Sequence, residues 1–295
     1  MKEDQEKIIK KAIKTVIPYI DELPYGKVIP SSWRAPEGFE NLRVKVNGIP
    51  VEHLVPDEKK TDRIIIQFHG GGYLVGLCNP YRKAAVKYSS VAGGAEVYSI
   101  DYRVAPTNKY PSALEDAVYI YKWLLKRGRN HNKMIIVGDS AGGNLALATT
   151  LYLKDNDIPL PKAVIAISPW ANASNDFPSV QLNLDNDVIL GRRGLKMADQ
   201  MDDPLYFHNA NLEDPYVSPV FGNYKGFPSL LIQLGEKEVL LDDGLKVSEV
   251  ATKAGVNSKV SIYKEMSHDF QIFIPELEES KNAWEEIEKF IEDNV

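Results

Sequence analysis

The sequence predicts an α/β fold with a mostly parallel sheet, helices on both faces of the sheet and a small helical cap. From about residue 62, short apolar runs alternate with longer amphipathic stretches, which is the pattern of repeated strand-helix units. The runs are apolar at nearly every position, as in strands that are covered on both faces. With 295 residues, of which 44% are hydrophobic, the chain can bury a large core.

The expected strands and helices follow in chain order. The apolar runs that predict strands are 63–68, 95–100, 134–138, 163–168, 229–235 and 259–263. Before them, residues 42–55 alternate between apolar and polar and predict an antiparallel hairpin that turns at Asn47 and Gly48. The clearest helical pattern is 112–128, which ends at Gly128.

Two regions fall outside this rhythm. Residues 1–40 begin with the spacing of an amphipathic helix, and residues 172–214 form a long insertion between two predicted strands. An interruption of this length in a compact domain usually has a function, or else its secondary structure has been assigned wrongly. Because residues 192–207 have helical spacing, we expect the insertion to form a small helical cap. The N-terminal segment would contribute to this cap over a main domain of residues 41–295.

Charge and cysteine content exclude several classes of partner. The net charge is −6 and the pI is about 5.5, so no overall basic field attracts nucleic acid. The single cysteine, Cys78, cannot form an intramolecular disulfide, which makes a cytoplasmic location the default expectation. The first twenty residues carry acids and lysines throughout. They predict a helix docked on the protein body, rather than a signal peptide, a membrane span or a membrane-surface helix.

The stretch IIVGDSAGGNLAL, residues 135–147, presents a serine where a strand is followed by a helix. Ser140 lies between Gly138 and Gly142, in the Gly-x-Ser-x-Gly pattern of a nucleophile elbow. Glycines suit a strained turn in which backbones approach closely. The pattern is short enough to occur by chance, and a helix N-cap is the alternative role for the serine.

A second glycine cluster, HGGGY at residues 69–73, follows the first parallel strand. Consecutive glycines cost backbone entropy on folding, so a run of three needs a compensating role. Bare N–H groups that point at a developing oxyanion are one such role. A phosphate-binding loop is the rival, but it needs Gly-Lys-Ser/Thr where this chain has Tyr73-Leu74-Val75.

A nucleophilic serine needs a histidine base and an acid that orients this base. In serine hydrolases built on such a sheet, the nucleophile, acid and base follow in that order along the chain. Of the five histidines, three precede Ser140 and His208 lies in the expected cap. This leaves His268, on the loop after the last strand, as the expected base; the alternative is an exposed loop histidine.

Several carboxylates follow the strand at 229–235, where the acid should lie. Glu238 stands in the loop just after this strand. Asp242 and Asp243 stand where the next helix should begin, and capping that helix is their simplest explanation. Glu238 is therefore the expected acid, with Asp242 as the alternative.

These motifs together resemble the hormone-sensitive-lipase-like family of α/β-hydrolase carboxylesterases. The similarity extends over residues 60–275 and rests, in order, on HGGGYLVG, DYRVAPTNKYPSALEDA, GDSAGGNLA, SPW, YVSPV, GEKEVLLDDG and SHDF. The family's acid motif reads Gly-x-x-Asp-x-Leu-x-Asp, and its aspartate aligns with Glu238. This carboxylate is one methylene longer, so the loop or the imidazole must shift to keep the hydrogen bond.

The resemblance implies the α/β-hydrolase fold and the activity of a serine carboxylesterase acting on short- to medium-chain acyl esters through an acyl-enzyme. It assigns the backbone N–H groups of Gly71, Gly72 and Ala141 to the oxyanion hole. It implies a small ester as the partner and neither a metal nor an organic cofactor. We also expect Tyr73, together with the cap, to line the substrate pocket.

The resemblance also suggests supporting residues around the glycine loop. His69, Asp101 and Arg103 are similar to residues that support this loop in the family. Thr107 stands where the family usually has a glutamate, which makes the network of these residues less predictable.

Three rival functions use the same observations differently. An amidase or formamidase would need identical motifs. A non-catalytic small-molecule receptor on a hydrolase scaffold would be marked by loss of the base, but His268 is present. A dehydrogenase would need a Gly-x-Gly-x-x-Gly after an early strand, and the chain has none there. The sequence leaves the oligomeric state open, and a homo-oligomer is compatible with it.

Overall fold

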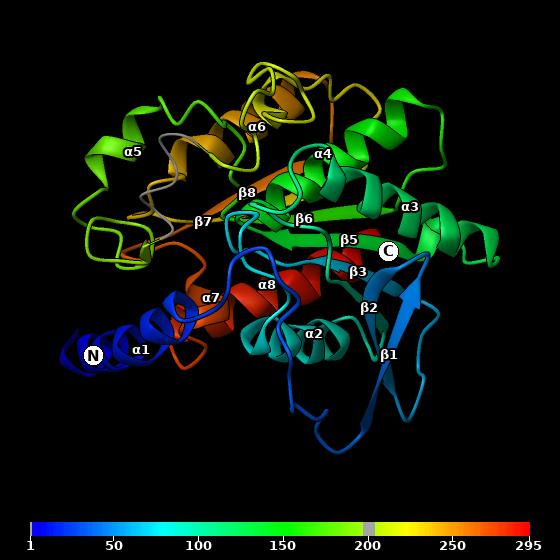
Figure 1. Ribbon diagram of the computed structural model, residues 1–295, viewed down its shortest axis with the longest axis horizontal. Coiled ribbons are helices and arrows are strands. Elements are labelled where there is room, and N and C mark those ends of the chain that lie inside the picture. Colours follow the sequence, from blue (N-terminus) through cyan, green and yellow to red (C-terminus); the bar gives the residue numbers. More distant parts are fainter. Residues whose placement is uncertain (1, 197–203) are drawn as a thin grey trace.

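The computed structural model describes residues 2–196 and 204–295, and it contains an eight-stranded sheet (Figure 1). The strands are β1 (Phe39–Val46), β2 (Ile49–Pro56), β3 (Ile64–Phe68), β4 (Glu96–Ile100), β5 (Met134–Asp139), β6 (Ala163–Ile167), β7 (Ser229–Gly235) and β8 (Ser258–Tyr263). Their order across the sheet is β1-β2-β4-β3-β5-β6-β7-β8. Each apolar run of the sequence is a strand of this sheet.

Strand direction follows the sequence pattern. The strands β4, β3, β5, β6, β7 and β8 pair in parallel, whereas β2 is antiparallel to both of its neighbours. The β1–β2 hairpin turns at Asn47 and Gly48, with φ angles of 52° and 84°. All residues of β3, β4, β5 and β6 are buried. The predicted mostly parallel, doubly covered sheet is confirmed.

Helices cover both faces of the sheet. They are α2 (Asn79–Val91), α3 (Ser112–Lys126), α4 (Ala141–Asp155), α6 (Leu241–Lys253), α7 (Phe270–Phe273) and α8 (Glu278–Asn294). Figure 1 shows α2 and α8 on one face and α3, α4 and α6 on the other. Helix α4 packs on β5 and β6 and runs directly from the end of β5, which places its N-terminus at the carboxyl edge of the sheet.

The N-terminal helix α1 (Lys2–Asp21) and the insertion lie at the same end of the molecule in Figure 1. They meet where the Lys196 N–H donates to Asp21 Oδ1 over 2.9 Å. Within the described part of the insertion, the α-helix is α5 (Pro178–Leu182). Part of the helix expected within 192–207, residues 197–203, lies outside the described residues, and the described residues on either side form turns and irregular backbone in place of an α-helix.

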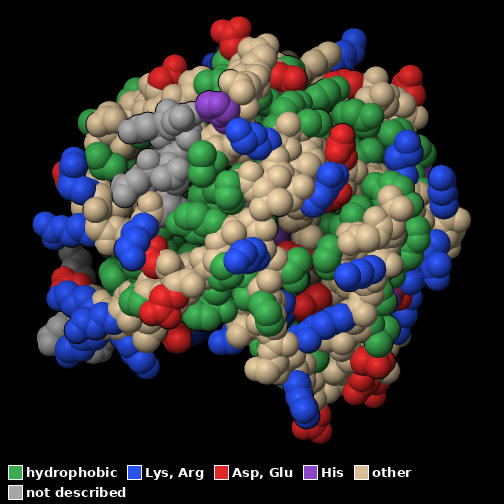
Figure 2. Space-filling model, in the orientation of Figure 1, with side chains coloured by type: hydrophobic (Ala, Val, Ile, Leu, Met, Phe, Trp, Pro, Cys, Tyr) green, Lys and Arg blue, Asp and Glu red, His purple; other side chains and the backbone are tan. Residues whose placement is uncertain are grey.

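Two surface properties complete the description. None of the helices in the described ranges has the combination of length and hydropathy needed to cross a bilayer. On the face drawn in Figure 2, acidic and basic side chains are interspersed over most of the surface.

Candidate active site

Ser140 occupies a strained turn between β5 and α4. Its φ and ψ angles are 53° and −119°, a conformation that L residues rarely adopt. The turn is fixed on both sides, because the Ser140 N–H donates to Ile167 O (2.9 Å) and its carbonyl accepts from the Trp170 N–H (3.1 Å). At Gly142, a Cβ would lie only 2.2 Å from Phe68 O, so no larger residue fits. This geometry holds the serine at the N-terminus of α4.

The side chains of Ser140 and His268 line the same small cavity, of about 20 Å³. Gly71 contributes to the same wall, so the structure brings three separate motifs of the sequence together. The other described residues that line it are Ile20, Val75, Cys78, Tyr81, Leu190, Leu195, Asp269 and Phe273. The cavity is therefore largely apolar, and both α1 and the insertion help to close it.

The glycine loop presents free backbone donors beside this cavity. Gly71 and Gly72 have φ angles of 107° and 61°, and a Cβ on Gly71 would lie 3.0 Å from Val75 Cβ. Within the described residues, neither the Gly71 nor the Gly72 N–H donates to a protein acceptor. Ala141 is the first residue of α4, so its N–H has no partner inside the helix.

The His268 imidazole lies between two carboxyl groups and is almost fully buried. Its Nδ1 is 3.9 Å from Glu238 Oε2, and its Nε2 is 3.0 Å from Asp269 Oδ2. Nδ1 has no hydrogen-bond partner among the described residues. The nitrogen that would take a proton from Ser140 therefore faces Asp269 in this structure.

Glu238 is completely buried in the loop after β7. Burial raises the pKa of its carboxyl to about 8, although the neighbouring His268 and a hydrogen bond from Ser168 lower it. The Ser168 Oγ–H donates to Glu238 Oε2 over 2.6 Å. Ser168 stands after β6 in the SPW motif, whose hydroxyl the sequence analysis did not assign to the site.

Asp242 and Asp243 point away from His268 and toward the insertion. Asp242 Oδ2 accepts the Ser179 N–H at 2.8 Å, and Asp243 Oδ1 accepts the N–H groups of Ala171 and Asn172 at 2.7 Å each. Both residues lie in the first turn of α6, where the sequence places the start of a helix, although the N-cap itself is Leu240. Their carboxylates accept main-chain N–H groups of residues 171, 172 and 179, so they join the start of α6 to the loop after β6 and to the insertion.

Asp187, inside the insertion, was missed by sequence reasoning. Its Oδ2 accepts the Val239 N–H at 3.0 Å, next to Glu238 in the chain, and its Oδ1 faces the His268 N–H at 3.4 Å. The same Oδ1 accepts the Ile189 N–H at 2.9 Å. One buried carboxylate thus links the insertion to the loops of both Glu238 and His268. No local pattern in the sequence signals this role.

Tyr73 was expected to line the substrate pocket, but its side chain lies in the core. It is 1% exposed, and its hydroxyl donates to Asn144 Oδ1 over 2.7 Å. Its ring stacks on Tyr206, with centroids 4.2 Å apart. Tyr73 is not among the described residues that line the cavity of Ser140. It instead joins the glycine loop to Asn144, which also donates to Trp170 O and Val217 O.

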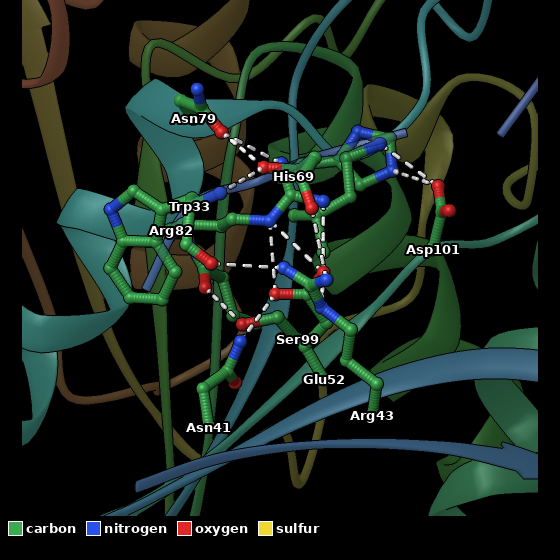
Figure 3. Close-up of polar contacts among 12 residues, drawn as sticks. Trp33, Asn41, Arg43, Glu52, His69, Asn79, Arg82, Ser99 and Asp101 are labelled. Atoms are coloured by element: carbon green, nitrogen blue, oxygen red, sulfur yellow. Dashed lines mark hydrogen bonds and ion pairs between the residues drawn. The ribbon is translucent and has the colours of Figure 1, made fainter. Parts of the chain in front are cut away.

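His69 lies beneath the glycine loop and faces Asp101, with Nε2 and Oδ1 3.8 Å apart (Figure 3). Burial lowers the pKa of His69 to about 4, so the ring is neutral at physiological pH. Its Nδ1 hydrogen-bonds with Gly70 O (2.8 Å) and its ring stacks on Tyr102. These contacts hold the loop, whereas Arg103, grouped with His69 in the sequence analysis, pairs with Asp116.

Figure 3 also shows a second polar cluster on the β2 side of the sheet, where Arg82 of α2 contacts Glu52 and Asn79. Arg82 is almost fully buried, and its guanidinium lies 2.8 Å from Glu52 Oε1. This ion pair fixes α2, the helix that follows the glycine loop, to β2.

Comparisons with known proteins agree with this geometry. Residues 65–272, more than half of the chain, match the family model described as alpha/beta hydrolase fold. An acetyl-hydrolase of Streptomyces hygroscopicus is 33% identical over 258 residues, which span 85% of this chain and 84% of that protein. An esterase of Acinetobacter venetianus is 31% identical over 249 residues, which span 84% of this chain and 80% of the relative.

Solved structures give the same result. The esterase EstE5, in a crystal soaked with p-nitrophenyl butyrate, has a TM-score of 0.82 and 32% identity, covering 96% of this chain and 98% of its own. An esterase of the bacterial hormone-sensitive lipase family has a TM-score of 0.82 and 30% identity, covering 97% of this chain and 98% of its own. The chain belongs to the hormone-sensitive-lipase-like family of α/β-hydrolase esterases.

Proposed function

We propose that this protein is a serine carboxylesterase that cleaves short- to medium-chain acyl esters, with Ser140 as nucleophile, His268 as base and Glu238 as orienting acid. The observation that carries the proposal is the strained Ser140 turn, which shares one cavity with His268 and the glycine loop. The relatives named as acetyl-hydrolase and esterase support the choice of substrate class.

In the acylation step, His268 Nε2 takes the proton of Ser140 Oγ as this oxygen attacks the ester carbonyl. The carbonyl oxygen becomes an anion, which the N–H groups of Gly71, Gly72 and Ala141 stabilise; one such donor is typically worth about 3 kcal/mol. Glu238, in its ionised form, stabilises the imidazolium through Nδ1, and the charge of the ring in turn lowers the pKa of this carboxyl group. The imidazolium then protonates the leaving alcohol, and the acyl group remains on Ser140.

In the deacylation step, His268 removes a proton from water, which attacks the acyl-enzyme in the same cavity. The same N–H groups stabilise the second oxyanion, and its collapse releases the carboxylic acid. The proton on Nε2 returns to Ser140 Oγ. The cycle consumes one ester and one water and yields one acid and one alcohol.

The closure of the cavity supports a preference for short acyl chains. Ile20 from α1 and Leu190 from the insertion face the same space as Ser140, and only about 20 Å³ is open between the lining residues. An acetyl or butanoyl group therefore needs far less rearrangement of these side chains than a long acyl chain.

The proposal is tested by hydrolysis of p-nitrophenyl esters of increasing chain length. We expect Ser140→Ala to abolish turnover and Glu238→Gln to reduce kcat by orders of magnitude. Asp242→Asn, a matched carboxylate in the same segment, should leave the reaction on Ser140 nearly unchanged, because Asp242 accepts from Ser179. Activity that survives in Glu238→Gln but is lost in Asp242→Asn would refute the assignment of the acid.

The amidase alternative uses the same residues on a C–N bond and needs its own test. Matched substrates with one acyl group, an acetate ester and an acetanilide, measure the preference directly. We expect kcat/KM for the ester to exceed that for the anilide by several orders of magnitude. The reverse ratio would make the protein an amidase.

A further inference from the structure

Asp269 follows the catalytic base directly and has no role in the reaction as written above. We propose that Asp269 is a competing hydrogen-bond partner for His268. In the resting enzyme, Asp269 holds Nε2 of His268. The imidazole must turn so that Nε2 faces Ser140 before acylation can begin. This inference rests on the proposed function of Ser140 and His268.

The geometry of His268 shows the competition. Nε2 lies 3.0 Å from Asp269 Oδ2, a normal hydrogen-bond distance, whereas Nδ1 is 3.9 Å from Glu238 and has no partner among residues 2–196 and 204–295. In the catalytic arrangement, Nδ1 carries the hydrogen and faces the acid, and the lone pair of Nε2 faces the serine. The contact with Asp269 therefore engages Nε2, the nitrogen that must be free to take the proton of Ser140.

Asp269 is held in place by its backbone and its surroundings. Its φ and ψ are 50° and 31°, in the left-handed region that Asp tolerates better than most residues. The Asp269 N–H donates to Ser168 Oγ at 3.2 Å, the same hydroxyl that donates to Glu238. Ser168 therefore connects the acid that supports catalysis with the carboxyl that competes with it.

Asp139, at the end of β5, interacts with Asp269, and both side chains are almost fully buried. Burial raises the pKa of both carboxyl groups well above the usual range of aspartate. Asp139 therefore adds a second buried carboxyl group beside Asp269.

The 3.0 Å contact between Nε2 and Asp269 Oδ2 contains one hydrogen, which either the imidazole or the carboxyl group carries. In both cases Nε2 has no lone pair for the Ser140 proton until the ring leaves Asp269. The contact therefore lowers the fraction of enzyme that is ready to react.

The titratable groups that face Asp269 come from several elements of the fold. They are Asp139 of β5, His268 of the same loop, Tyr81 and Tyr88 of α2, Asp187 of the insertion and Glu238 after β7. Among these groups, only His268 can become a cation, so it is the only one that can form an ion pair with Asp269.

The test replaces Asp269 by glycine, which tolerates the left-handed backbone, and by asparagine, which keeps the shape without the charge. We expect Asp269→Gly to react with phenylmethanesulfonyl fluoride at Ser140 at least about tenfold faster at pH 7. In both variants kcat should rise more than KM changes, because the released imidazole acts in the chemical step and not in substrate binding. Asp269→Asn should show the smaller gain in labelling, since its amide oxygen still accepts from Nε2.

Asp243→Asn is the matched control, because Asp243 is another buried aspartate that bonds only main-chain N–H groups in the described structure. It should leave kcat and the labelling rate unchanged, whereas a general effect of removing a buried carboxyl group would change them as in the Asp269 variants. Equal or slower labelling with an unchanged kcat in both Asp269 variants would overturn the inference. Turnover that survives Ser140→Ala would instead refute the proposed function, so the two failures are distinguishable.

Discussion

The Ser168 hydroxyl donates to Glu238 Oε2 over 2.6 Å, from a residue seventy positions away in the chain. This bond is the one hydrogen bond that the described structure gives to a carboxylate oxygen of Glu238, since Oε1 has no partner. It joins the loop after β6 to the loop after β7 at the carboxyl edge of the sheet.

Ser168→Ala should lower kcat/KM by about tenfold to a hundredfold, because Glu238 loses the bond that fixes its carboxylate opposite Nδ1. Steady-state hydrolysis of p-nitrophenyl acetate measures the loss. Ser89→Ala is the control, since Ser89 is equally buried but donates to Ala95 O, in the turn between α2 and β4. A similar loss in both variants would mean that the effect is one of general stability.

Asp187→Ala should reduce the free energy of unfolding by about 3 kcal/mol, because several buried N–H groups lose their acceptor. It should also lower kcat at least tenfold, since the loops of Glu238 and His268 lose their common link to the insertion. Urea denaturation and kinetics measure the two effects. Asp185→Ala removes only an exposed ion pair with Arg192, so its stability should stay within about 0.5 kcal/mol of wild type.

Glu238 should make the protein less stable as the pH rises. Its pKa is about 8 in the folded chain and near 4.3 in the unfolded chain, so folding binds a proton between these values. Its stabilising contribution is complete below the unfolded pKa and is lost as the pH rises through the folded pKa.

Glu238→Gln cannot titrate, so its Tm should exceed that of wild type at pH 9 by more than at pH 5. Thermal unfolding at the two pH values measures the difference. A constant difference would contradict the burial of an ionisable group at this position.

Leu190→Ala should widen the cavity of Ser140 and favour longer acyl chains. We expect the ratio of kcat/KM for octanoate to that for acetate esters to rise by about tenfold, since apolar contacts of one or two methylenes are worth this much. Leu182→Ala changes an exposed leucine of the same insertion and should leave the ratio unchanged. An unchanged ratio in Leu190→Ala would place the acyl chain elsewhere.

The sheet could be predicted because the residues that determine each strand and the hairpin turn are neighbours in the sequence. The strands at 134–138 and 163–168 are apolar at nearly every position, and the turn at Asn47 and Gly48 has a specific backbone requirement. The strand-turn-helix context of Ser140 is local in the same way, and it places this serine at the edge of the sheet where the structure has it.

Other parts of the site could not be predicted, because they depend on contacts between distant segments. Asp187 binds the Val239 N–H across 52 residues, and Asn144 binds Val217 O across 73. Single polar residues in such contacts leave no periodic pattern. The prediction that Tyr73 lines the substrate pocket was wrong for the same reason. Its position beside the glycine loop does not reveal that its side chain points inward and donates to Asn144.

The link through Asp187 has a consequence for engineering. Exchanging residues 172–214 for the corresponding segment of a relative would change more than the lining of the Ser140 cavity, because Asp187 also connects the insertion to the loops of Glu238 and His268. A chimera that lacks a carboxylate at this point would acquire a new specificity only at the expense of its catalytic rate. In this chain, a change in the insertion would therefore affect both the substrate selectivity and the catalytic rate.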